Sequence, residues 1–298
     1  MGVALRGAFS DILAPGLAEV IALAYKKYPE EYSKIFTVET SKRQYEKTTT
    51  IEGMGPAVVK LEGAPVSYAD LTQGYDKTYT HITYGLGFRV SKEMYDDDLY
   101  GVMKKAAEYL GRSVKLKIET SAANVFNNGF DSSFTGGDGK ELFATDHPFA
   151  SGGTGRNELS TPADLTTASI EQALSDIEGT TDSTGMPIAL IAKTLLVAPA
   201  NRWAADVILG SQLKSGTANN DKNPLLDLNL SYMVNHYLSD ADAWFLLCDQ
   251  NELKFYNRES PLFENEDDFD TKDGKFSVTT RFSTGWADWP GVFGTPGA

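Results

Sequence analysis

The sequence contains little of the chemistry that cysteine and histidine provide. Cys248 is the only cysteine among 298 residues, which excludes an internal disulfide framework and a metal site built from several thiolates. It lies in the apolar run 244–248, so we expect a buried, inert thiol. Of the three histidines, His81 and His236 fall within strand patterns, where packed or surface imidazoles are commoner than functional ones.

Positive charge and long apolar runs are also scarce. The chain has 27 basic and 41 acidic residues, for a formal net charge of -14. This balance argues against a dedicated binder of the phosphate backbone and favours solubility. No apolar run approaches the ~20 residues that span a bilayer, and the N-terminus lacks a cleavable signal pattern. We therefore expect a soluble protein of ordinary globular composition, made and used in the cytosol, with no membrane partner.

The strongest pattern is a helical one between residues 95 and 129. Apolar side chains recur there every three or four residues, which places them on one face of an α-helix. Residues 96–98 supply a candidate acidic N-cap, and 127–129 a candidate left-handed end. Lysines and arginines, among them Lys115, occupy the other faces, and Gly111 is a candidate bend. A helix of roughly 30 residues is about 45 Å long, more than a core of this size needs, so we interpret it as a spine.

Between residues 42 and 90 the period changes from helix to strand. Residues 43–51 and 80–90 alternate in the manner of β-strands, and the glycine- and proline-rich stretch 53–74 separates them. The simplest interpretation is a long two-stranded ribbon with a loose tip. Because an isolated ribbon is unstable in water, it should lie against a neighbour. The alternative is a ribbon that folds back on its own domain.

The other segments predict an arm and a compact unit. A short helix before Pro29 must pack on something, since it is marginal alone. Helices at 166–179 and 202–209, with strands within 188–198, 231–238 and 243–248, suggest an α/β unit around a central sheet. Asp273 and Gly274 predict a two-residue hairpin turn. The aromatic tail 285–294 should be covered.

Catalytic patterns are poor. Asp146 and His147 are adjacent, but neighbours in sequence rarely face each other, and no nucleophile turn accompanies them. The glycine-rich stretch 135–140 is not a phosphate-binding loop, because Glu141 replaces the required Ser or Thr. We predict no enzyme activity, no catalytic residue and no cofactor.

Metal sites are equally poorly supported. Residues 131–136 resemble the start of a calcium loop, but Leu142 stands where a bidentate Glu is needed. The acidic run 264–270 could bind a cation, although a solvated edge is the commoner case. We predict no metal site.

Several stretches, in order along nearly the whole chain, resemble the major capsid proteins of tailed bacteriophages, and among them the Mu-like major head subunits. They are 111–113 through 128–130, then 138–143 and 146–148, then TLLVAP at 194–199, 223–225 with the strands to Cys248, and RFSTGWADWPGVFG at 281–294. None is a catalytic motif, so the resemblance rests on order and coverage.

The resemblance implies an α+β protein with the Hong Kong 97-type capsid fold. It maps an N-terminal arm to residues 1–41 and an extended β-ribbon loop to 42–90. A peripheral domain with the spine helix would take 91–185 and 268–298, and an axial α/β domain 186–267.

The same resemblance implies self-assembly into the hexamers and pentamers of an icosahedral shell that encloses dsDNA. The protein would be located in the virion after assembly in the host bacterial cytoplasm. A portal is implied and, because no long scaffold-like extension precedes the arm, a separate scaffolding protein; a decoration protein is a further candidate partner. The acidic charge leads us to expect no sequence-specific grip on the DNA.

The ribbon supplies the predicted subunit interface. The candidate interface residues are Tyr45, Ile51, Tyr79, Ile82 and Tyr84. An encapsulin-type compartment shell, which holds enzyme cargo, is the alternative within the same fold. A monomeric binding or hydrolytic protein is the alternative from a different class.

Overall fold

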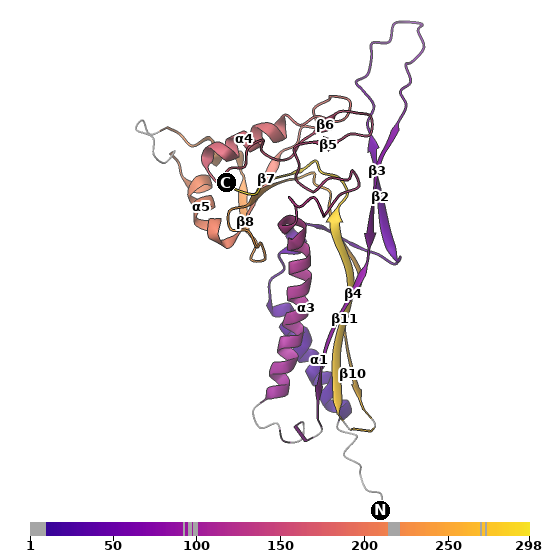
Figure 1. Cartoon of the computed structure of the whole chain (residues 1–298), viewed down its shortest axis with the longest axis vertical. Coiled ribbons are helices and arrows are strands. Elements are labelled where there is room, and N and C mark those ends of the chain that lie inside the picture. Colours follow the sequence, from indigo (N-terminus) through magenta and orange to yellow (C-terminus); the bar gives the residue numbers. More distant parts are fainter. Residues whose placement is uncertain are drawn as a thin grey trace, which may run out of the picture.

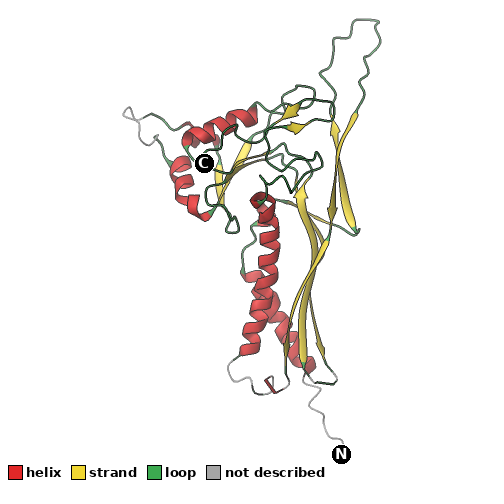
Figure 2. Ribbon diagram, in the orientation of Figure 1, coloured by secondary structure: helices red, strands yellow, loops and turns green. Residues whose placement is uncertain are grey.

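The computed structural model describes residues 10–91, 93–94, 97, 101–213, 221–268, 270–271 and 273–298, with the backbone alone for 10–18 and 267. The molecule is elongated (Figure 1). A long sheet carries two helices on one face, a compact α/β unit lies at one end, and a ribbon projects beyond that end (Figure 2). Among the described residues, no helix is both long and apolar enough to cross a membrane.

The long sheet has the strand order β1-β10-β11-β4. Its strands are β1 (Thr37–Thr40), β10 (Leu253–Asp267), β11 (Gly274–Trp286) and β4 (Ile82–Val90). β1 runs parallel to β10, and the other pairs are antiparallel. Alternate residues of β11, including Val278 and Phe282, are buried in one core cluster with the helices. The opposite face of β11 therefore carries the intervening residues.

The spine prediction is confirmed by helix α3 (Val102–Asn127), which has 26 residues. The predicted acidic N-cap is wrong, because the N-cap is Gly101, at φ 66°. The helix ends at Asn127, as the predicted end 127–129 requires, but Asn128 has a φ of −102°, outside the left-handed region. Asp96, Asp98 and Leu99 lie outside the described residues.

Helix α1 (Ser10–Lys27) belongs to the predicted arm and packs on α3. A Cβ atom built on Gly111 would lie 2.5 Å from the Ile21 carbonyl oxygen. Gly111 therefore allows the two helix backbones to approach closely, a role that the sequence alone did not suggest. The short 3₁₀ turn η2 (Tyr32–Lys34) follows and leads into β1.

The ribbon consists of β2 (Tyr45–Glu52) and β3 (Thr72–Thr80), which pair antiparallel. Its second strand is thus 72–80, and the predicted limb 80–90 is wrong. Residues 82–90 form β4, which pairs with β11 in the long sheet. The physical reason is aromatic packing: Tyr84 and Phe88 stack on Phe282 and Phe276, at centroid distances of 4.9 Å and 5.0 Å.

The compact unit is built on a second sheet with the order β12-β9-β7-β8. Helix α4 begins after Thr166, which forms a reciprocal capping box with Ser169. Cys248 is buried in β9, as predicted, and burial raises the pKa of its thiol to about 12, which favours the unreactive protonated form. The strands are β7 (Ala192–Val197), β8 (Ser231–Val234), β9 (Trp244–Cys248) and β12 (Val292–Thr295), and the helical elements are α4 (Thr167–Glu178), η3 (Pro199–Asn201), α5 (Arg202–Gly210) and η4 (Pro224–Leu228).

Two strand connections differ from expectation. Asp267 pairs with Gly274, so residues 268–273 join β10 to β11, and the predicted two-residue turn is wrong. The long sheet also takes β10 from the segment assigned to the axial domain and β4 from the segment assigned to the extended loop. The domain limits themselves stay a prediction.

Candidate assembly surface

The base of the ribbon is anchored to the body of its own molecule. Tyr79 of β3 is buried against Tyr256 of β10, with ring centroids 5.0 Å apart. Lys77 Nζ donates to the Thr135 carbonyl at 2.6 Å and lies 4.9 Å from the centroid of the Trp286 ring. These contacts tie β3 both to the long sheet and to the loop that follows α3.

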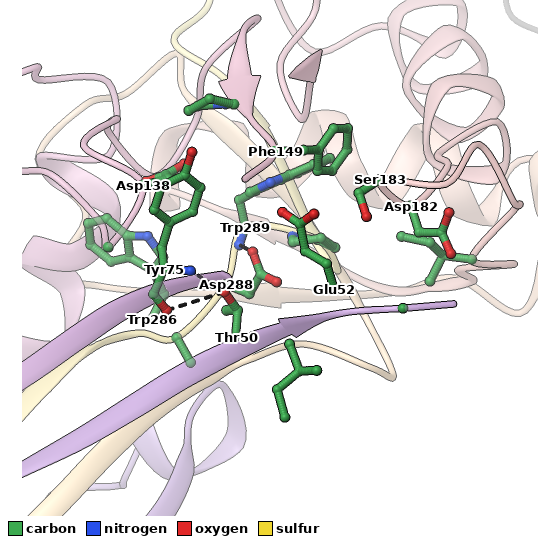
Figure 3. A pocket seen from close by; sticks show the side chains of 17 residues that line it. Thr50, Glu52, Tyr75, Asp138, Phe149, Asp182, Ser183, Trp286, Asp288 and Trp289 are labelled. Carbon is green, nitrogen blue, oxygen red and sulfur yellow. Dashed lines mark hydrogen bonds between the residues drawn. The ribbon is translucent and has the colours of Figure 1, made fainter. Parts of the chain in front are cut away.

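A cavity of about 110 Å³ lies where the ribbon meets the body (Figure 3). The side chains of Glu52, Asp138, Asp182 and Asp288 are part of its lining. Glu52 accepts hydrogen bonds from the backbone N–H groups of residues 150 and 151. The other three carboxylates also accept from donors of their own chain. Burial raises the pKa of Asp288 to about 6. The cavity therefore lies at a contact between ribbon and body that contains hydrogen-bonded carboxylates.

The tip of the ribbon, residues 53–71, contrasts with the base. It contains no strand, and every one of its residues except Ala64 is exposed. The side chains of Val59 and Tyr68 are 89% and 92% exposed. Exposed apolar groups gathered on a projection mark an interaction surface. The large apolar residues of the tip are Met54, Val58, Val59, Leu61, Val66, Tyr68 and Leu71.

The structure separates the five predicted interface residues. Tyr45 and Ile51 lie on β2 with more than half of each side chain exposed. Ile82 is exposed but belongs to β4, and Tyr84 packs on Phe282. Tyr79 is 2% exposed. Tyr79 is therefore covered by the long sheet of its own molecule, and Ile82 and Tyr84 belong to that sheet and not to the ribbon. That these five residues contact a second subunit stays a prediction. The tip residues were missed, although their apolar side chains were a readable signal.

His147 occupies a buried network that the sequence did not predict. Its Nδ1 lies 2.6 Å from Asp138 Oδ2 and its Nε2 lies 3.0 Å from Asn157 Oδ1. The His147 ring stacks on the Trp289 ring, with the ring centroids 4.9 Å apart and an angle of 6° between the ring planes. Asp146 pairs instead with Lys140, at 2.7 Å. The network links the loop after α3 to the C-terminal tail and contains no nucleophile. Within the described ranges, no group of three or more His, Cys, Asp or Glu side chains is placed to hold a metal ion.

A buried ionic junction joins α3 to the end of the arm. Lys115 and Glu119 have side chains only 2% and 1% exposed. Lys115 Nζ lies 2.9 Å from Glu30 Oε1 and 3.5 Å from Glu119 Oε1, as ion pairs without hydrogen-bond alignment. Glu119 accepts from the backbone N–H groups of Glu31 and Tyr32. Lys115 is thus a core residue, and its assignment to an outer face of the spine is wrong.

The junction extends to the compact unit. Glu31 accepts from the backbone N–H of His236 at 3.0 Å, and its Oε1 lies 2.6 Å from His236 Nδ1. The rings of Tyr25 and Tyr32 lie 5.1 Å and 5.3 Å from Lys115 Nζ, within cation–π range. Arm, spine and compact unit therefore meet at one charged centre.

Comparison with known proteins identifies the family. The family described as phage capsid protein matches residues 74–294, well over half of the chain. The chain therefore belongs to the phage capsid protein family. The comparison with curated proteins finds no match.

Solved capsid structures share the fold. The capsid of cyanophage P-SCSP1u matches with a TM-score of 0.61 at 7% identity, over 91% of this chain and 88% of that one. The procapsid of bacteriophage JBD30 matches with a TM-score of 0.53 at 16% identity, over 98% of this chain and 76% of that one. A virus-like particle from Pyrococcus furiosus matches with a TM-score of 0.51 at 13% identity, over 94% of this chain and 97% of that one. At these identities the likeness shows the fold alone. The predicted α+β Hong Kong 97-type capsid fold is confirmed, and the Mu-like subdivision stays a prediction.

Proposed function

We propose that this capsid protein is the major head subunit of a tailed dsDNA phage or prophage, and that it assembles into the hexamers and pentamers of an icosahedral shell around the genome. The observation that carries the proposal is the tip, 53–71: an apolar segment on an anchored projection, left uncovered by its own subunit. Family membership supports the same assignment.

The ribbon suits a head-to-tail contact between subunits. Each tip lies on the neighbouring subunit, whose own tip reaches the next, and such heterologous contacts close into rings when the rotation permits. The anchored base sets the direction of the tip, which limits the orientational freedom lost on binding. Tyr45 and Ile51 extend the same exposed surface toward the base.

The remaining partners follow from this role. A separate scaffolding protein, a portal and a decoration protein would act on the assembled subunits in the host cytoplasm before the mature virion forms. The net charge of -14 per subunit, repeated around a shell, disfavours adhesion to packaged DNA. A structural role of this kind requires no enzymatic activity.

Replacing residues 54–70 by a short glycine linker tests the proposal. We expect a folded subunit with an unchanged circular dichroism spectrum that forms no closed shells, measured by electron microscopy and sedimentation. A Ser67→Ala variant, which keeps every apolar residue of the tip, is the control and should assemble. Normal shells from the linker variant would exclude the tip as the assembly contact.

An encapsulin-like compartment is the second candidate, because the chain also shares its fold with a particle from Pyrococcus furiosus that is described as virus-like and not as a phage capsid. The content of particles from the native host distinguishes the two. Nuclease-protected dsDNA supports the phage head, and particles filled with protein cargo support the compartment.

A further inference from the structure

Two arginines on the long sheet, Arg258 and Arg281, have no polar partner among the residues that the structure describes. The Nε atoms of Arg258 and Arg281 are buried without a hydrogen bond. In the part of the chain that the structure describes, neither guanidinium forms an ion pair or donates a hydrogen bond. Both arginines are half-buried, and a buried N–H donor without an acceptor is costly. A subunit with a net charge of -14 has many carboxylates, yet none pairs with these two groups.

The sheet geometry brings the two arginines to one place. Asn257 pairs with Phe282 and Glu259 with Arg281, so Arg258 is the extra residue of a β-bulge beside Arg281. A bulge re-aims a side chain. Arg281 alternates with Thr280 and Phe282, which are buried, so it lies on the face of β11 away from α3.

His81 confirms that the two charges share one neighbourhood. Its ring is fixed by Ser283 Oγ at 2.9 Å and Ser41 Oγ at 3.0 Å. Burial lowers the pKa of His81, and the charges of Arg281 and Arg258 lower it further, while Glu46 opposes them. Both guanidinium groups therefore act on the same imidazole. We call Arg258 and Arg281 the arginine pair.

The ribbon tip carries a matching charge. Residues 53–71 hold two carboxylates, Glu62 and Asp70, and one ammonium group, Lys60. Both carboxylates are exposed, and within the described residues neither has a partner. Glu62 lies in the turn closed by the Ala64 N–H and the Leu61 carbonyl, next to Gly63 at φ 76°. It is the midpoint of the tip, about 30 Å from Gly53 along an extended chain, whereas Asp70 lies next to β3.

We infer that the arginine pair is the docking site for a second copy of this chain, and that Glu62 at the tip of the neighbouring ribbon binds it. The two carboxylate oxygens can accept from both guanidinium groups, and hydrogen bonds between ionised partners are stronger than those between neutral groups. The inference rests on the proposed function and names the contact that orients one subunit on the next. Because the pair is unsatisfied in the isolated subunit, docking removes a cost rather than exchanging one internal bond for another.

Charge reversal tests the contact in the full-length protein. Glu62→Arg and Arg281→Glu should each reduce the yield of shells by ~10-fold or more, the scale expected for breaking a buried charge pair at an interface. The double variant should recover most of the yield. Asp70→Asn, which removes the other carboxylate of the tip, should assemble normally. Glu62 is exposed, so its substitution should leave the isolated subunit folded, with an unchanged circular dichroism spectrum.

A crosslink tests the same contact independently of charge. Glu62→Cys combined with Thr279→Cys places one thiol on the tip and one beside Arg281 on β11. After oxidation of assembled shells, denaturing gels should show a ladder of linked subunits. The native Cys248 is 3% exposed and should not contribute. Asp70→Cys with Thr279→Cys is the matched control and should remain unlinked.

The outcomes separate this inference from the proposed function. If the unaltered protein forms no shells, the proposed function fails. If it forms shells and Glu62→Arg assembles as well as the unaltered protein, the docking inference is overturned. Loss of assembly in an Arg281→Glu subunit that keeps its circular dichroism spectrum, without loss in Glu62→Arg, also overturns it.

Discussion

The ribbon tip and the Lys115 junction handle exposure in opposite ways. At the junction, the charged groups of Lys115 and Glu119 are almost fully buried, and each has partners from the same subunit. At the tip, apolar groups are exposed, and their subunit provides no cover. The first arrangement stabilises one subunit, whereas the second leaves surface for another. The comparison teaches that one chain can place its internal and its intersubunit stabilisation in separate segments.

Replacing Lys115 with Met should have the largest effect on the isolated subunit. The substitution leaves Glu119 buried without its cation, and removing one partner of a buried ion pair costs about 3–5 kcal/mol. We expect a loss of that size in the free energy of unfolding, measured with urea. Adding Glu119→Gln should recover part of it. A loss below about 1 kcal/mol would show that the junction contributes little to subunit stability.

The sequence predicted the helix that carries the junction, but not that charged side chains of this helix are buried. The apolar stripe of α3 has the helical period and faces a core, so Leu110, Val114 and Ile118 are buried as expected. Lys115 is buried because the arm crosses that side of the helix, and its contacts from the arm are Glu30 and the rings of Tyr25 and Tyr32. No local period encodes a contact with a segment more than 80 residues away.

The sequence predicted the first strand of the ribbon, β2, but not the second strand, β3. β4 alternates clearly because Tyr84 and Phe88 pack on a core. β3 alternates weakly because the ribbon is largely exposed and only Tyr79 is buried. Alternation therefore reports which strands line a core, and it assigned the second limb of the ribbon to the wrong strand. The tip was predicted as loose, but periodicity could not show that its apolar residues lack cover.

The pH dependence of the junction should be a smaller effect. Burial raises the pKa of Glu119 above its ordinary 4.5, although backbone hydrogen bonds and Lys115 oppose the shift. The folded subunit then holds this proton more tightly than the unfolded chain, so stability falls as pH rises from 4.5 through the folded pKa. We expect the unfolding free energy of the unaltered protein, relative to that of Glu119→Gln, to fall as the pH rises above 4.5. A difference independent of pH would contradict the assigned direction.

The smallest effect on the isolated subunit should come from the tip, where the comparison is sharpest. Val59→Ser and Tyr68→Ser remove exposed apolar groups that touch no core, so each should change the free energy of unfolding by no more than about 0.5 kcal/mol. The same variants should lower the yield of shells, because those groups are buried only between subunits. Lys115→Met tests the opposite case. It should lower the free energy of unfolding of the isolated subunit and act on no contact between copies directly. If the serine variants unfold at a markedly lower urea concentration as isolated subunits, the tip packs on its own molecule. Internal and intersubunit stabilisation would then not lie in separate segments.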